Sequence, residues 1–204
     1  MPPAQRQDDV VKVRSALSPE EARDAILCLD AVFPEHPGWL SRRGALAAAV
    51  SADPSLAVVA VDEGRIAGAA ISDGSGCIDA IGLDAAYRRQ GVGSRLLRAA
   101  EEVVRSRGGR RVTLGSVDDA TGFYLACGYQ AVLLVQFRSG ERDLAARAQG
   151  LEAGPLQGHA VLRSEWEGSP QLFVQTGAVD FALKRRVEEF DSGAECCFVM
   201  GKDL

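Results

Sequence analysis

The alternation of apolar and polar positions divides the chain into short helices and strands. The strongest helical pattern spans residues 92–107, where apolar residues recur three and four positions apart and charged residues occupy the opposite face. A second helix is predicted from the start signal Ser18-Pro19-Glu20-Glu21, in which a serine cap precedes proline and glutamate. It should end near Phe33, before Pro34 and a turn at Pro37-Gly38. We expect further helices at residues 40–50, 121–127 and 178–190.

Strands are predicted where compact or alternating apolar runs lie between turn residues. These runs are residues 10–13, 56–61, 66–72, 77–83, 111–117, 129–137, 159–166, 171–175 and 196–200. The order strand, loop, helix, strand over residues 77–117 predicts a right-handed βαβ unit, with strands 77–83 and 111–117 parallel. Residues 139–158 have a weak pattern, which favours a loop with one or two helical turns.

Composition narrows the class of protein. The chain has 204 residues, of which 47% are apolar and 25% charged, as in an ordinary globular protein. The net charge of −5 argues against a nucleic-acid partner. Residues 1–9 are polar, contain two prolines and predict a disordered tail rather than a signal peptide. No apolar run approaches 18 residues, so we expect no membrane segment and a cytoplasmic location.

The cysteines do not indicate a metal site. Five are present, at positions 28, 77, 127, 196 and 197, and none belongs to a Cys-x-x-Cys pair. Neither His36 nor His159 has metal-site spacing to a cysteine. We therefore expect reduced thiols and no metal.

The segment Arg88-Arg89-Gln90-Gly91-Val92-Gly93-Ser94 opens the strongest helix. Glycine lets a backbone approach a ligand closely, and a helix start offers N–H groups that suit phosphate. A dinucleotide fingerprint would need glycine at Leu96, and a Walker loop would need lysine at Ser94. A glycine loop alone is more typical of a plain strand-to-helix turn.

A wider pattern indicates a family. The stretch Ile81–Leu97 resembles the acyl-CoA signature of the GNAT superfamily of N-acyltransferases, carried here by Arg88, Gly91 and Gly93. The stretch Gly122–Tyr129 looks like the family's second motif, and residues 198–204 look like its last strand. Ala85 replaces a frequent proline, and Val117-Asp118-Asp119 stands where many members have an asparagine that contacts the coenzyme.

The resemblance implies an α/β (α+β) fold, in which a central mixed sheet is flanked by helices. Residues 10–138 would form the acyl-CoA-binding core and residues 194–204 its last strand. Residues 139–193 would then be a ββα insertion between strands that the family usually joins by a short loop. Such an insertion would act as a lid over the acceptor or as a packing or dimer element, so a homodimer stays open.

The resemblance also assigns site residues. Backbone groups of Ile81 and Leu83 would pair with the pantetheine arm of the coenzyme, with Gly82 at a bulge or close backbone approach. Backbone N–H groups from the basic loop would hold the pyrophosphate. The cofactor-binding residues are thus Ile81, Gly82, Leu83, Arg88, Arg89, Gln90, Gly91, Val92, Gly93 and Ser94. Tyr124 would face the thioester sulfur.

The implied reaction is direct transfer of an acetyl group from acetyl-CoA to a primary amine, either on a small molecule or on a protein. Tyr124 would need a lowered pKa to protonate the leaving thiolate, or would stabilise it by hydrogen bonding. No base is identified, and Asp79 and Asp119 are the candidates. The alternatives are a non-catalytic acyl-CoA sensor or interaction module, and a purely structural α/β domain.

Overall fold

The computed structural model describes residues 11–137, 141–166 and 168–204. The predicted tail at 1–9, Val10 and the boundary between 138 and 139 lie outside these residues. Two compact units are present, one formed by residues up to 112 with 203–204 and the other by residues 113–202. The elements are β1 (Lys12–Ser15), α1 (Pro19–Val32), α2 (Pro37–Ala52), η1 (Pro54–Leu56), β2 (Ala57–Asp62), β3 (Arg65–Ser72), β4 (Ile78–Leu83), η2 (Ala85–Tyr87), α3 (Val92–Ser106), β5 (Arg111–Ser116), η3 (Asp118–Ala120), α4 (Thr121–Ala126), β6 (Gln130–Phe137), α5 (Leu144–Ala153), β7 (Ala160–Trp166), β8 (Ser169–Gln175), α6 (Phe181–Phe190) and β9 (Ala194–Asp203).

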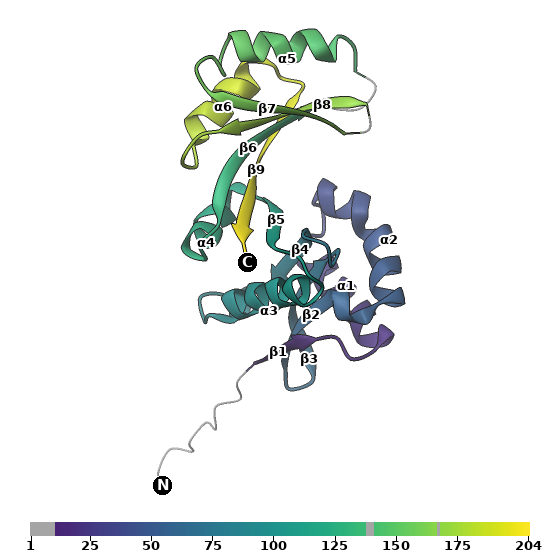
Figure 1. Cartoon of the computed structure of the whole chain (residues 1–204). Coiled ribbons are helices and arrows are strands. Elements are labelled where there is room, and N and C mark those ends of the chain that lie inside the picture. The colour runs from purple at the N-terminus through teal and green to yellow at the C-terminus, as the bar shows by residue number, and fades with distance from the viewer. Residues whose placement is uncertain (1–10, 138–140, 167) are drawn as a thin grey trace. The chain divides into compact units, whose positions relative to one another are not determined.

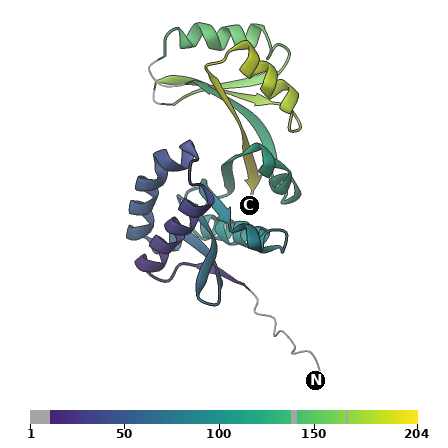
Figure 2. The same ribbon diagram turned by 180° about the vertical axis from the view of Figure 1, so that it is seen from behind.

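The first unit is built on a four-stranded sheet in the order β1-β2-β3-β4, with antiparallel neighbours throughout. Helices α1 and α2 cover one face of the sheet and α3 covers the other, as the front and back views show (Figures 1 and 2). The apolar face of α1 packs on the strands through Ile26 and Leu29, which are buried with Val59 and Ile71. Ile26 and Leu29 are three positions apart, which places them on one face of the helix.

The helix starts follow local chemistry. The Ser18 hydroxyl accepts a hydrogen bond from the Glu21 backbone N–H at the start of α1, as predicted. Helix α2 begins earlier than expected, because Pro37 and Gly38 form its first turn rather than a separate turn. Proline suits that position, since its missing N–H would have no partner inside the helix. Nδ1 of His36 accepts from the Trp39 N–H and caps the helix.

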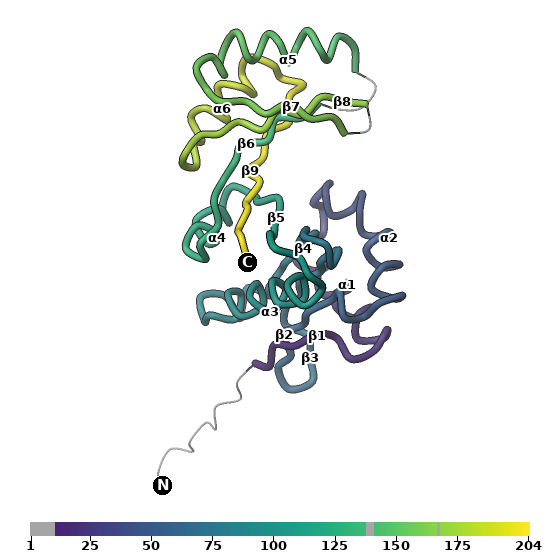
Figure 3. The backbone as a smooth tube through the Cα atoms, viewed as in Figure 1, coloured from purple at the N-terminus to yellow at the C-terminus, as the bar shows by residue number. Residues whose placement is uncertain are grey.

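The second unit is built on a five-stranded sheet in the order β5-β9-β6-β8-β7. Strand β9 pairs antiparallel with the whole of β6, from Gln130 opposite Gly201 to Phe137 opposite Ala194. The β7–β8 hairpin extends the sheet on the other side of β6, as the tube view in Figure 3 shows. The described residues between β6 and β9 therefore supply two strands and two helices. That these residues are an insertion into a family core remains a prediction.

Two expectations about elements need correction. The weakly patterned segment after residue 139 contains the ten-residue helix α5, whose Ala148 and Leu151 are buried on one side. Only two of its positions are buried, and this explains the weak pattern. The strands at 77–83 and 111–117 were expected to pair in parallel, but β4 and β5 belong to different sheets and β5 pairs with β9. The α/β class itself is confirmed.

The helices of the described residues also bear on membrane insertion. None of the helices there is both long enough and apolar enough to cross a bilayer. The cytoplasmic location stays a prediction.

Candidate functional site

Strand β4 lies at the edge of the first sheet. Its register with β3 shows which of its residues turn their backbone groups toward β3 and which turn them toward the open edge. The Asp84 N–H donates to the Ala67 carbonyl at 2.8 Å, in register with the β3–β4 ladder. Hydrogen-bonded residues alternate along an antiparallel pair, so Gly82 turns its backbone groups toward β3. By the same alternation, Ile81 and Leu83 present theirs at the outer edge, where the described residues supply no partner strand. These are the two residues that the sequence assigns to pantetheine.

The bulge that was one of the two expectations for Gly82 lies elsewhere in β4. The register of β4 shifts not at Gly82 but between Ile78 and Ala80, so the bulged residue is Asp79. A Cβ atom at Gly82 would lie 2.9 Å from Leu29 and 3.0 Å from Val32 of α1. Gly82 therefore lets α1 pack closely on the strand.

The loop from Arg88 to Ser94 combines a left-handed backbone with a helix start that has no side-chain cap. Arg89 and Gly91 both adopt left-handed backbone angles, with φ of 61° and 74°. Gly91 caps α3 without a side-chain hydrogen bond, whereas α1 is capped by a serine and α6 by Asp180. No side-chain cap therefore offsets the partial positive charge of this helix start, and the same is true of α4 and α5.

The arginines of the loop add charge beside this helix start. Arg88 and Arg89 are exposed, and the Arg88 Nε donates a long hydrogen bond of 3.4 Å to the Leu83 carbonyl. Gln90 Nε2 holds the loop by donating to the Ala86 carbonyl at 2.8 Å. A cavity of about 660 Å³ lies beside this end of β4, lined on one side by Leu83 and Arg88 and on another by Cys28 of α1. Its volume is typical of a ligand pocket.

Tyr124 lies on the short helix α4 in the second unit and is buried. Its ring packs edge-on against Phe123 and Tyr129, with centroids 5.1 and 5.8 Å away. Burial raises the pKa of the Tyr124 phenol to about 12, with a smaller contribution from Cys127. A phenol with this pKa is a hydrogen-bond donor at neutral pH, which favours the second of the two alternatives, hydrogen bonding, over a lowered pKa.

Asp119 is an exposed residue of the turn η3, and the structure gives it no distinctive environment. Its neighbour Asp118 is held by Lys184 of α6, whose ammonium donates to both carboxylate oxygens at 2.7 Å. Lys184 is only 15% exposed. The segment between β6 and β9 thus ties down the turn that precedes Tyr124, a contact that nothing in the sequence pattern indicated.

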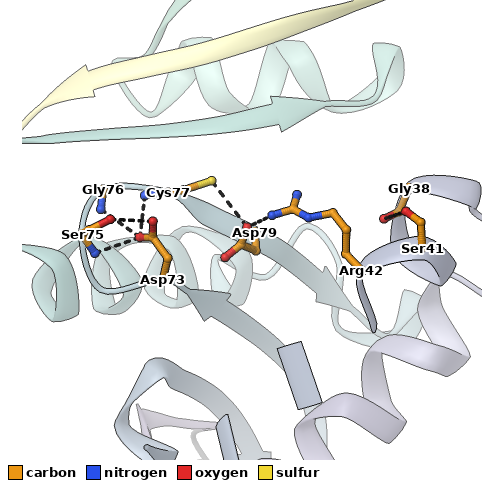
Figure 4. Close-up of polar contacts among 8 residues, drawn as sticks. All are labelled: Gly38, Ser41, Arg42, Asp73, Ser75, Gly76, Cys77 and Asp79. Atoms are coloured by element: carbon orange, nitrogen blue, oxygen red, sulfur yellow. Dashed lines mark hydrogen bonds and ion pairs between the residues drawn. The ribbon is translucent and has the colours of Figure 1, made fainter. Parts of the chain in front are cut away.

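Asp79, the other candidate base, has side-chain contacts with two described residues (Figure 4). Arg42 of α2 forms an ion pair with Oδ1 of Asp79, and the Cys77 thiol approaches the same oxygen at 3.6 Å. Asp73 stabilises the turn that follows it, because its Oδ1 accepts hydrogen bonds from the backbone N–H groups of residues 75, 76 and 77. An arginine beside a carboxylate stabilises its charged form, and this disfavours Asp79 as a proton acceptor.

Burial affects four of the five thiols. All five cysteines are unbridged, and the described part of the chain contains no group of metal-ligating side chains. Burial raises the pKa of the Cys28, Cys77 and Cys197 thiols, and that of Cys196 to about 12. A protonated thiol is a poor nucleophile.

The first unit therefore brings together the predicted strand edge and loop, while Tyr124 and Asp119 belong to the second unit. Sequence reasoning missed Arg42 and Lys184. Both act through partners far away in the chain, so no local motif could reveal them.

Comparison with known proteins adds a family to this geometry. Residues 19–129, more than half of the chain, match the model of the acetyltransferase (GNAT) family. No curated protein matches the chain.

Solved structures support the fold. The chain is similar to the polyamine N-acetyltransferase of Drosophila melanogaster, with 15% identity, a TM-score of 0.58 and coverage of 96% of this chain and 100% of the other. It is also similar to a protein from Pyrococcus horikoshii described as an acetyltransferase, with 15% identity, a TM-score of 0.54 and coverage of 95% and 89%. A GNAT-family protein from Desulfovibrio desulfuricans gives 17% identity, a TM-score of 0.50 and coverage of 81% and 97%. At these identities the likeness concerns the fold.

Proposed function

This chain belongs to the acetyltransferase (GNAT) family, and from that premise we propose that it transfers an acetyl group from acetyl-CoA directly to a primary amine. The acceptor is a small-molecule amine or a protein amino group. The observation that carries the proposal is the continuity of two features in the first unit. The outward backbone edge at Ile81 and Leu83 leads directly into the loop and the helix start that Gly91 leaves without a side-chain cap.

The two features suit different parts of the coenzyme. Pantetheine contains amides that can pair with the outward N–H and C=O groups of Ile81 and Leu83, as an added strand would. The pyrophosphate suits the N–H groups from Arg89 to Ser94, with Arg88 and Arg89 supplying charge. Arg88 and Leu83 also line the cavity of about 660 Å³.

The chemistry follows from the thioester. The neutral amine nitrogen attacks the acetyl carbonyl, the carbon–sulfur bond breaks, and the coenzyme leaves as a thiolate that then gains a proton. A thiol has a pKa near 8.5, roughly 3.5 units below that of a phenol at 12, so full proton transfer from Tyr124 would cost about 5 kcal/mol. We assign Tyr124 the role of a hydrogen-bond donor to the thiolate, and the amine proton goes to water or to a group not yet identified.

Isothermal titration with acetyl-CoA, followed by an amine panel with release of the free thiol as readout, tests the assignment. We expect binding at micromolar concentrations and thiol release that depends on the added amine. Binding without release for any amine would favour a non-catalytic acyl-CoA sensor. No binding would overturn the proposal.

Replacing Tyr124 tests its role separately. We expect Tyr124→Phe to lower kcat roughly 10- to 100-fold while acetyl-CoA affinity changes little, because the hydroxyl acts on the leaving thiolate. Since the phenol titrates only near pH 12, the loss should be the same at every pH from 6 to 10. Tyr129→Phe is the matched control, because it removes the hydroxyl of the buried ring 5.8 Å away. Equal losses in both variants would remove Tyr124 from the reaction.

A further inference from the structure

Asp79 is a charged side chain in an unusual place. Its side chain is only 7% exposed, and it occupies the bulge of an edge strand. A buried carboxylate needs a cation or several donors to offset its lost hydration. Arg42 is the cation that does so, and it reaches across from α2 (Figure 4). The two contacts that Asp79 makes within the described part of the chain both use Oδ1, so Oδ2 can accept a hydrogen bond from another group.

Two adjacent arginines on α2 show how different such contacts can be. Arg43 grips Asp30 of α1 with two nitrogens on two oxygens, each at 2.5 Å, and the Trp39 ring N–H adds a third hydrogen bond to that carboxylate. This fork joins α2 to α1. Arg42 instead uses one nitrogen on one oxygen, and its side chain is 52% exposed. Because half of the Arg42 side chain is exposed, another cation can reach Asp79 and replace Arg42, provided that the incoming group takes over the compensation of the buried carboxylate.

The position of Asp79 along β4 connects this carboxylate with the proposed coenzyme. An acyl-CoA held by its pyrophosphate at residues 88–94 would run back along Leu83 and then Ile81, so its acyl end points toward Asp79. Only Ala80 lies between Asp79 and Ile81, so their Cα atoms are at most roughly 7 Å apart. With the reacting nitrogen beside Ile81, a carboxylate at Asp79 is placed to bind a second cation of the acceptor rather than that nitrogen.

We propose that Asp79 binds an ammonium group of the acceptor and that Arg42 occupies this position until the acceptor displaces it. The preferred acceptor is then a primary amine that carries a second cationic group about four or five carbons from the first. This inference rests on the proposed acetyl transfer. Asp79 acts as a specificity residue, and Arg42 as an internal competitor that lowers apparent acceptor affinity.

The test compares 1,4-diaminobutane with butylamine, which differ only in the second amine. We expect the wild-type kcat/KM to favour the diamine at least tenfold. Asp79→Asn should reduce that ratio to near one while acetyl-CoA affinity stays constant. Arg42→Gln should lower the diamine KM several-fold, because the competitor is gone, with little change for butylamine. Arg43→Met is the matched control, and it should lower the melting temperature without changing the ratio.

Binding measured without turnover separates the two hypotheses. Titration of 1,4-diaminobutane should give tighter binding to Arg42→Gln than to the wild type, and none to Asp79→Asn. This result would support the subsite even if no amine were acetylated, an outcome that would contradict only the proposed function. If both amines react equally well, or if Arg42→Gln impairs both amines alike, Arg42 is a structural partner of Asp79 and the inference is wrong.

Discussion

The arginines of the loop before α3 and the cations between β6 and β9 differ in whether carboxylate groups pair with them. Among the described residues, Arg88 and Arg89 belong to no ion pair, and both are exposed beside a helix start that lacks a side-chain cap. In the second unit, Arg147 holds Asp191 and Glu141 and lies over the Phe137 ring at 4.9 Å. Arg163 likewise holds Glu152, and Lys184 holds Asp118.

The difference teaches how to separate ligand-binding charge from structural charge. A cation whose carboxylate partners are already in place contributes to the fold and has little left for a ligand. A cation beside a helix start that lacks a side-chain cap, with no carboxylate partner, can be used by an anion, and this is the role that we propose for Arg88 and Arg89. Composition alone cannot make this distinction, because all these residues count equally toward the net charge.

Reversing charge in the loop should have the largest effect. The double variant Arg88→Glu/Arg89→Glu should weaken acetyl-CoA binding roughly 30- to 100-fold, because two attractive contacts become repulsive. The melting temperature should stay within a few degrees of the wild type, since neither arginine pairs with a carboxylate. Isothermal titration at low and high salt measures both affinity and screening. Wild-type affinity that does not fall with added salt would contradict the electrostatic assignment.

Much of the fold was predictable because its signals are local. The Ser18 cap, the amphipathic face of α3 and the apolar runs of β2 and β3 lie where the pattern put them. The errors are tertiary in origin. Whether β5 pairs with β4 or with β9 depends on a strand some 80 residues further along the chain, which no window around β5 contains.

The candidate site divides in the same way. Glycine at 91 and the parity of Ile81 and Leu83 follow from local backbone geometry, so the motif predicts them. The function of Gly82 depends on Leu29 and Val32 of α1, and the state of Asp79 depends on Arg42 of α2. The raised pKa of Tyr124 results from burial, which a motif does not report.

Removing the contacts of Arg147 should lower stability and leave acetyl-CoA affinity unchanged, which is the reverse of what we expect for the loop variant. Arg147→Met should lower the free energy of unfolding by about 2 kcal/mol, because charge-assisted hydrogen bonds to two carboxylates are lost. Acetyl-CoA affinity should not change. Arg147 holds the pKa of Asp191 below its ordinary value, so the stabilisation exists at neutral pH and is lost as the pH falls below about 4. Thermal unfolding of wild type and variant should therefore converge in acid.

We expect the smallest change in acetyl-CoA affinity from alanine substitutions at two glycines with similar surroundings. Gly91 and Gly108 begin and follow the same helix, with φ of 74° and 88°, and a Cβ atom at either would have nothing within 4 Å. Alanine at either position should cost about 1 kcal/mol through backbone strain alone. Only Gly91→Ala should also weaken acetyl-CoA binding, about fivefold, because relieving the strain turns the loop N–H groups away from the pyrophosphate. If titration gives the same affinity for both variants, the N–H groups near Gly91 do not hold the coenzyme, and the charges of Arg88 and Arg89 would have to act without them.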